Sequence, residues 1–295
     1  MTACGDGKEA ERRVESGVIL AGRGMLEEAI AQYDEAIDRD SEYALAYYNR
    51  GNAYIELNQI PRAIEDLDEA TRLDPRIVPA YVTLGLVYDN LGDFQNAIDN
   101  YDEAIRLDPG DPEIYNNRGN IYASLSIYVL AINDYDEVIR LNPGDPTAYY
   151  NRATPYFDQG LHEQAIEDLD QAIRLDPQYD LAYMNRGLVY FDLDQADRAI
   201  LEFDIALRLN PELVPAYVNR GFAYGGMQQP ERAIEDFDQA ISLDPRHASA
   251  YANRARAYTI LGRDTEATRD VVSAVQLGFN LATLELEIKR LQERR

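Results

Sequence analysis

Six asparagines recur along the chain at an interval of 34 residues, or twice that where one is replaced. A carboxamide donates and accepts hydrogen bonds together, so a row of them could match the peptide groups of an extended chain without reading its side chains. The alternative is that each amide only satisfies polar groups of neighbouring helices. Thr83 interrupts the row, whose members are Asn49, Asn117, Asn151, Asn185, Asn219 and Asn253.

Side chains that could perform catalysis or hold a metal are scarce. His162 and His247 are the only histidines, which excludes a multi-histidine metal centre and an HExxH helix. The chain has no GxxxxGK phosphate loop and no GxSxG elbow, and the DPGDP run at 108–112 lacks the alternating oxygen ligands of an EF-hand. Cys4 is the only cysteine, so no intrachain disulfide can form. We predict a protein that is not an enzyme and that has no cofactor and no metal.

The chain is strongly acidic, with 53 Asp and Glu against 28 Lys and Arg and a formal net charge of −25. Its long-range field repels phosphate backbones and anionic lipid surfaces. We therefore expect no nucleic-acid partner, and no stretch approaches the apolar length of a membrane span. The acidity either serves solubility or recognises a basic partner.

The opening MTACG allows two expectations about localisation. A cytoplasmic protein is the default. The alternative is an exported lipoprotein anchored through Cys4, because Thr-Ala-Cys-Gly is similar to the end of a bacterial lipoprotein cleavage box. An unmodified Cys4 in mass spectrometry of the native protein would exclude the anchor.

The chain repeats itself every 34 residues. A small residue recurs at Gly51, Gly85, Gly119, Ala153, Gly187, Gly221 and Ala255. A second marker, an alanine that is followed by Ile in all copies except the last, recurs at Ala29, Ala63, Ala97, Ala131, Ala165, Ala199, Ala233 and Ala267. The second series gives eight repeats.

The period and its markers resemble the tetratricopeptide repeat (TPR) family, whose unit is a helix, a turn and a second helix. In the second repeat the family's marker positions read Tyr47, Gly51, Tyr54, Ala63, Leu67, Ala70 and Pro75. The resemblance implies an all-α fold, a right-handed α-solenoid. With Gly51 as position 8, the repeats are 10–43, 44–77, 78–111, 112–145, 146–179, 180–213, 214–247 and 248–281.

Helical geometry predicts which positions pack. At 100° per residue, positions 4, 8 and 11 of the first helix point within about 60° of one another. In repeat four these are Tyr115, Gly119 and Tyr122. A small residue at position 8 lets the second helix approach closely, and positions 20 and 24 of that helix, such as Ala233 and Phe237, are expected to face it.

Both ends of the array are expected to differ from its middle. Leu284 and Ile288 recur at helical spacing within a predicted C-terminal capping helix, residues 282–295. Basic residues are concentrated at the C-terminal end of this helix, where the helix dipole favours cations. They are Lys289, Arg290, Arg294 and Arg295. The first repeat is degenerate, and residues 1–9 are predicted to be a frayed N-terminus.

Arginine occupies position 7 in six repeats, whereas the third has Leu84 there. The arginines could form a ladder for an acidic ligand, but pairing with second-helix aspartates such as Asp66, Asp134 and Asp168 is favoured. Because ion pairs at a buried rim often contribute little net stability, Arg118→Leu is expected to change the melting temperature only slightly. The six arginines are Arg50, Arg118, Arg152, Arg186, Arg220 and Arg254.

Pro155 stands at position 10 of a first helix, where a hydrogen bond is lost at a cost of roughly 3 kcal/mol. It marks either a hinge between two halves of the array or a tolerated local bend. In both cases Pro155→Ala should raise stability.

The resemblance implies that positions 2, 5, 6, 9, 12 and 13 of the first helices line a concave groove. Peptide-binding candidates are the asparagine row together with Tyr48, Tyr150, Phe157, Met184, Phe191 and Phe222. Acidic side chains accompany them at Glu56, Asp89, Glu113, Asp158 and Asp192. A basic or apolar segment therefore fits this groove better than an acidic one.

The predicted function is a non-catalytic protein–protein interaction scaffold that binds a peptide or helix of a partner protein in the groove. The alternative is a structural protein that assembles with itself into a filament or ring by stacking solenoids, so a homo-oligomer is possible.

Overall fold

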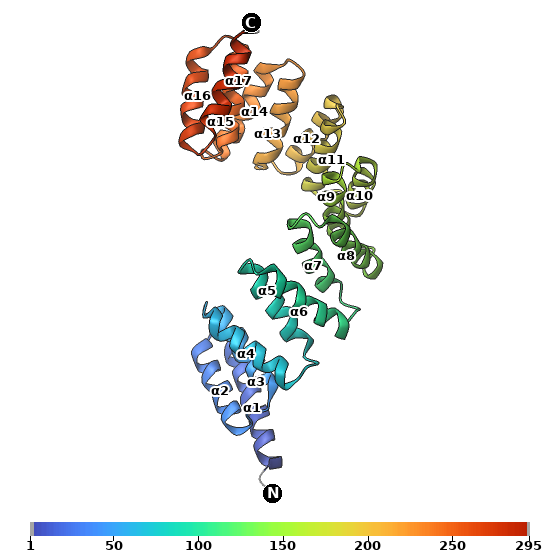
Figure 1. Ribbon diagram of the computed structural model, residues 1–295, viewed down its shortest axis with the longest axis vertical. Coiled ribbons are helices and arrows are strands. Elements are labelled where there is room, and N and C mark those ends of the chain that lie inside the picture. Colours follow the sequence, from blue (N-terminus) through green and yellow to red (C-terminus); the bar gives the residue numbers. More distant parts are fainter. Residues whose placement is uncertain (1–2, 294–295) are drawn as a thin grey trace. The chain divides into compact units, whose positions relative to one another are not determined.

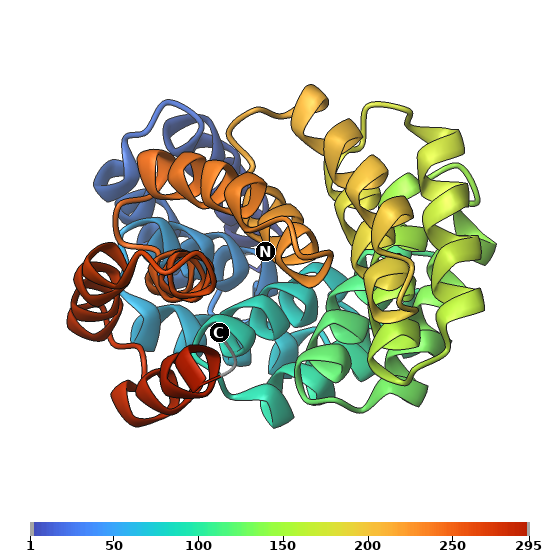
Figure 2. The ribbon, with the colours of Figure 1, turned by 90° about the horizontal axis from the view of Figure 1, so that it is seen from above.

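A computed structural model describes the backbone of residues 3–293 and the side chains of residues 7–293. Within that range all regular structure is helical, as the two views of the ribbon show (Figures 1 and 2). The helices divide into two compact units, one ending at Pro143 and the other starting at Gly144. The fold is therefore an all-α helical repeat, as predicted.

The first unit contains four helix pairs, and each helix packs on its neighbours in the chain. Its helices are α1 (Ala3–Ala21), α2 (Leu26–Arg39), α3 (Ala44–Glu56), α4 (Ile60–Leu73), α5 (Val78–Asn90), α6 (Phe94–Leu107), α7 (Pro112–Ser124) and α8 (Tyr128–Leu141).

The second unit contains four pairs and one further helix. Its helices are α9 (Pro146–Asp158), α10 (His162–Leu175), α11 (Asp180–Asp192), α12 (Ala196–Leu209), α13 (Val214–Gly226), α14 (Pro230–Leu243), α15 (Ala248–Ile260), α16 (Asp264–Gln276) and α17 (Leu281–Glu293).

Local sequence explains where the helices begin and turn. Asp111 and Asp145 cap α7 and α9 by accepting hydrogen bonds from the backbone N–H groups of Glu113 (2.9 Å) and Thr147 (2.8 Å). Position 15, in the turn of every pair, has a positive φ between 57° and 76°. Glycine suits that conformation and fills it in four repeats, at Gly24, Gly92, Gly160 and Gly262.

The core confirms the predicted close approach at position 8. A Cβ built on Gly85 would lie 2.6 Å from the ring of Tyr101, and one on Gly187 would lie 2.7 Å from the ring of Phe203. Only glycine leaves room for an aromatic ring at that distance. Repeat five has Ala153, and there position 24 is the smaller Leu169.

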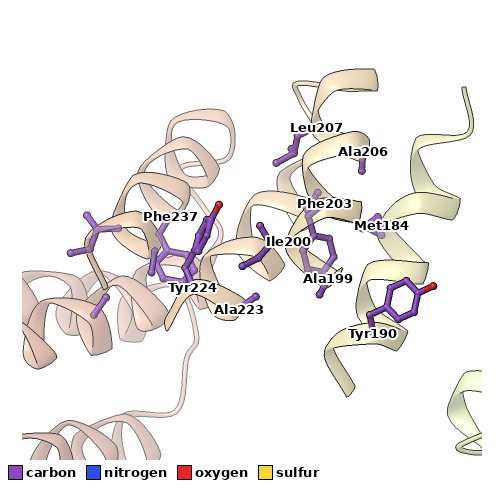
Figure 3. Close-up of a cluster of buried hydrophobic side chains, with 14 residues drawn as sticks. Met184, Tyr190, Ala199, Ile200, Phe203, Ala206, Leu207, Ala223, Tyr224 and Phe237 are labelled. Atoms are coloured by element: carbon purple, nitrogen blue, oxygen red, sulfur yellow. The ribbon is translucent and has the colours of Figure 1, made fainter. Parts of the chain in front are cut away.

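The most buried stripe of the first helices differs from the predicted one. Position 3 is at most 1% exposed in repeats two to eight, where it is Ala46, Ala80, Ile114, Ala148, Ala182, Ala216 and Ala250. Tyr115 at position 4 of repeat four is 8% exposed, as predicted, whereas other tyrosines at position 4, such as Tyr47 and Tyr149, are half-buried at the margin. Figure 3 shows part of this core, where Met184 and Tyr190 lie beside Phe203 and Tyr224 lies beside Phe237.

Three predictions about chain segments need comment. Helix α1 begins at Ala3, so residues 3–9 are helical rather than frayed. Helix α9 runs through Pro155 without interruption, and the division between units falls at Pro143 rather than at Pro155. The expectations for the Cys4 side chain and for Arg294 and Arg295 lie outside the described residues.

Candidate functional site

The candidate site is the surface formed by positions 2, 5, 6, 9, 12 and 13 of the first helices, here called the first-helix face. Each unit has its own. In the first unit it lies on α1, α3, α5 and α7, and in the second on α9, α11, α13 and α15.

The face of the second unit carries a row of aromatic side chains. Phe157 and Phe191 occupy position 12 of α9 and α11, and Phe222 occupies position 9 of α13, about one turn earlier on the same face. Phe222 is 52% exposed, and its ring meets that of Phe191 edge-on at 5.5 Å between centroids. Phe157 and Phe191 are half-buried. Aromatic side chains in contact at a surface are typical of protein-binding sites.

A pocket of about 220 Å³ opens on this face between α9 and α11. Phe157, Asn185 and Leu188 form its walls, and Thr154 and Asp158 stand exposed at its mouth. Leu169 reaches it from α10, where repeats three, four, six and seven have an aromatic ring at position 24. The smaller leucine explains why space remains here.

Two predicted binding residues of this unit are largely used in packing. Met184 is 9% exposed and belongs to a buried cluster with Tyr190 and Phe203, because position 5 faces the adjoining helix pair. This corrects its assignment to the open groove. Tyr150 packs on Tyr179 at 5.0 Å between ring centroids; burial raises the pKa of the Tyr150 hydroxyl, and a hydrogen bond with Asn185 acts against that rise.

The asparagine row is not uniform. Asn49 donates to the Leu45 carbonyl at 2.7 Å, Asn185 bonds to Tyr150 and Asn253 accepts from Arg256. Asn49 and Asn253 thus bond within their own helices and Asn185 bonds to a neighbouring helix, and Asn151 also has an interaction. Among residues 7–293, the side chains of Asn117 and Asn219 make no such bond.

The face of the first unit combines acidic and polar side chains with the exposed apolar residues Leu45 and Leu86. It carries Glu11, Glu15, Glu56, Asp89 and Glu113, and α7 adds a run of asparagine side chains. Its one predicted aromatic contact residue, Tyr48, is partly buried against the cluster around Leu67.

Helix α17 covers the end of the second unit's face. It packs mainly on α15, where Leu284 is fully buried. Arg256, at position 9 of the face, donates to Glu287 of α17 at 2.8 Å through Nε, and its guanidinium lies 5.6 Å from the Phe279 ring. The C-terminal helix therefore packs mainly on the first helix α15, and also contacts the second helix α16. The open part of the face is carried by α9, α11 and α13.

The position-7 arginines lie away from this face, between the two helices of a pair. Arg118 donates to Asp134 through Nε (2.9 Å) and Nη2 (2.6 Å), and its Nη1 binds Asp102 of the preceding repeat. Arg50, Arg220 and Arg254 repeat this double pairing, and Arg186 does so with Glu202 and Asp170. Tyrosine rings at positions 4 and 11 flank the guanidinium, as at 5.9 and 5.8 Å for Arg118. The predicted pairing is confirmed, and these arginines are internal.

The pairing geometry changes the expected cost of losing one arginine. Asp134 is only 4% exposed, and burial raises its pKa while Arg118 lowers it. Removal of Arg118 alone would leave a buried carboxylate without its cation, which is a costly state. The small effect expected from the sequence is therefore replaced by a large one.

Sequence reasoning missed one contact beside the pocket. His162, at the start of α10, places Nε2 3.2 Å from Asp192 at the end of α11, and its ring lies 5.9 Å from that of Phe157. Positions 17 and 13 of successive repeats carry the two side chains, and only the stacking of repeats brings them together.

No group of three or more His, Cys, Asp or Glu side chains among the described residues is arranged to hold a metal ion. No helix within the same range is long and apolar enough to cross a membrane.

Comparisons with known proteins agree with the repeat. A family model described as "Tetratricopeptide repeat" matches residues 44–77, 112–145 and 214–247, and two others with that description match 181–213 and 237–269. A model described as "TPR repeat" matches 17–57, 90–126 and 155–194. No curated protein matches the chain.

Several solved structures share the fold. A tetratricopeptide repeat protein from Parabacteroides merdae has a TM-score of 0.63 at 20% identity, with 84% of this chain and 98% of that chain covered. MamA has a TM-score of 0.51 at 27% identity, with 58% and 94% covered. The hetero-tetramer Cut9–Hcn1 provides a match with a TM-score of 0.64 at 18% identity, with 91% and 52% covered. The repeat period, the paired helices and these matches lead to one conclusion: the chain belongs to the tetratricopeptide repeat family and has the architecture of a protein-interaction scaffold.

Proposed function

We propose that the second unit binds an extended or helical segment of a partner protein along α9, α11 and α13. The observation that carries this proposal is the aromatic row of Phe157, Phe191 and Phe222 beside a pocket of about 220 Å³. Aromatic side chains at an exposed, partly hollowed surface supply apolar contact area at low entropic cost.

Charge specifies the kind of segment. The first-helix face of α9, α11 and α13 has no Lys or Arg, whereas Asp158 and Asp192 are both exposed on it. A segment with apolar side chains and one or two cations complements that surface, because the cations pair with the carboxylates while the apolar groups cover the rings. The role is binding rather than catalysis, as is general for TPR proteins.

Peptide selection on the full chain tests the proposal. The probe is a random twelve-residue phage-displayed library, from which we expect apolar peptides with Lys or Arg. The double variant Phe191→Ala/Phe222→Ala should weaken the selected peptides by at least about tenfold. The matched control is Leu45→Ala/Leu86→Ala, which removes side chains that are 44% and 41% exposed on the first unit's face and should leave affinity unchanged.

Circular dichroism of each variant first establishes that it is folded. Selected peptides that bind the Phe191→Ala/Phe222→Ala variant as tightly as the native chain would overturn the proposal, as would a selection that enriches acidic peptides. Solenoid stacking into a filament or ring remains the alternative prediction.

A further inference from the structure

A second surface of the chain, far from the aromatic row in sequence, exposes apolar side chains in the turn between α7 and α8. Leu125 and Ile127 are 40% and 41% exposed in the turn, and Val129 and Leu130 are 65% and 42% exposed in the first turn of α8. All four belong to the first unit and lie within six consecutive residues; together they are here called the repeat-four patch.

The other repeats show that two residues of this patch, Val129 and Leu130, are unusual. Val129 and Leu130 occupy positions 18 and 19, which lie on the outer surface of the second helix in each copy. Every other repeat has at least one charged or amide side chain there. The pairs are Glu27–Glu28, Pro61–Arg62, Gln95–Asn96, Glu163–Gln164, Asp197–Arg198, Glu231–Arg232 and Thr265–Glu266. The repeat fold therefore does not require apolar residues at these positions, and solubility opposes them.

The segment of chain that carries the patch also lacks charged residues. Residues 119–133 form a run of 15 without Asp, Glu, Lys or Arg, in a chain of which 27% is charged. The charged residues that bound this run, Arg118 and Asp134, bind each other. The residues of this run thus offer no carboxylate to a basic partner and no cation to an acidic one.

We propose that the repeat-four patch is a contact surface between two copies of this chain. Two copies with a net charge of −25 each repel one another, so they can approach closely only where the surface is uncharged. A two-fold axis through the patch would pair each apolar side chain with the same set on the second copy, which is the self-complementary arrangement of a symmetric dimer. This proposal does not depend on the proposed peptide-binding function.

Salt separates this contact from binding of a basic peptide. Salt screens the repulsion between two acidic copies, so self-association through the patch should strengthen as ionic strength rises. Attraction between a cationic peptide and the carboxylates of the second unit should weaken under the same change.

Analytical ultracentrifugation of the full chain over a wide concentration range tests the proposal. We expect a reversible monomer–dimer equilibrium that shifts toward the dimer as salt is added. The variant Val129→Glu/Leu130→Gln gives repeat four the pair that repeat five carries, so it is compatible with the fold. It should weaken dimerisation by at least about tenfold.

The control variant is Leu201→Glu. Leu201 is 62% exposed on α12, at a position where repeats two, five and seven have Glu65, Glu167 and Glu235, and its substitution should leave the dimer unchanged. A chain that stays monomeric at every concentration and salt level would overturn the proposal. So would association that survives Val129→Glu/Leu130→Gln, or that Leu201→Glu weakens equally.

Discussion

Repeats three and four solve the same packing problem in two ways. In repeat four, Arg118 is held between Asp134 of its own second helix and Asp102 of the preceding repeat. In repeat three, Leu84 and Asn100 stand where Arg118 and Asp134 stand in repeat four. Leu84 is 1% exposed, and Asn100 donates to the Asn96 carbonyl of its own helix at 2.8 Å.

The difference shows that positions 7 and 23 act as one structural pair. Where the cation is absent, the buried carboxylate that would need it is absent too, so no charge is left unpaired in the core. The arginines are therefore part of the scaffold, which leaves recognition to other surfaces. Asp68 of repeat two is the exception. Its equivalents in other repeats, such as Asp34 and Asp102, bind the position-7 arginine of the following repeat. The repeat that follows Asp68 has Leu84 at position 7, so Asp68 has no arginine to bind there.

The largest loss of stability is expected when only one partner of the Arg118–Asp134 pair is replaced. Arg118→Leu should destabilise the first unit by about 3 kcal/mol, because Asp134 stays buried without its cation. Urea denaturation followed by circular dichroism measures it. A loss below about 1 kcal/mol would restore the view that this ion pair contributes little.

A smaller loss of stability is expected when repeat four is given the residue types that repeat three has at positions 7 and 23. Arg118→Leu/Asp134→Asn supplies the same two residue types as Leu84 and Asn100, so most of the stability lost in Arg118→Leu should return, leaving a deficit of about 1 kcal/mol. The same denaturation assay compares the two variants. A double variant as unstable as Arg118→Leu would show that the positions are not coupled.

The smallest effect concerns Asp68. Asp68 is solvent-exposed, but partial desolvation by its neighbours raises the pKa of its carboxyl group. The folded state therefore binds the proton more tightly than the unfolded state and loses stability as pH rises through that pKa. Asp68→Asn should therefore raise the melting temperature slightly at pH 7, with the gain vanishing below about pH 4, where aspartate is protonated. An equal gain at both pH values would mean that charge is not the cause.

Much of the fold could be predicted from the sequence because the same residue types recur at the same positions in every repeat, so a pattern seen in one repeat can be checked in the others. The 34-residue spacing of Gly51, Gly85 and Gly119 predicted paired helices, and the aspartates of the second helices predicted the partners of the arginines. The burial of Met184 and the margin position of Tyr47 did not follow, because a helical angle says which way a side chain points but not where the adjoining pair lies. The path of α17 across α15 depends on tertiary contacts such as Arg256–Glu287, which no repeat pattern encodes.

The candidate site was less predictable than the fold. The aromatic row was visible in the sequence, but the pocket beside Phe157 depends on Leu169, which belongs to the other helix of the pair. The asparagine row looked uniform in the sequence. In the structure its members differ because Tyr150 and Arg256 bind Asn185 and Asn253.

The double pairing of the arginines also bears on how the first unit comes apart. Each guanidinium binds an acidic residue of its own repeat and so joins the two helices of that repeat. It also binds an aspartate of the preceding repeat, as Arg118 binds Asp102. These contacts contribute to the coupling between repeats on which cooperative unfolding of a linear array depends. Repeat three has Leu84 instead of this arginine, so the ion pair between repeats two and three is missing. Partial unfolding of the first unit is therefore expected to separate there first, with repeats three and four opening as one block.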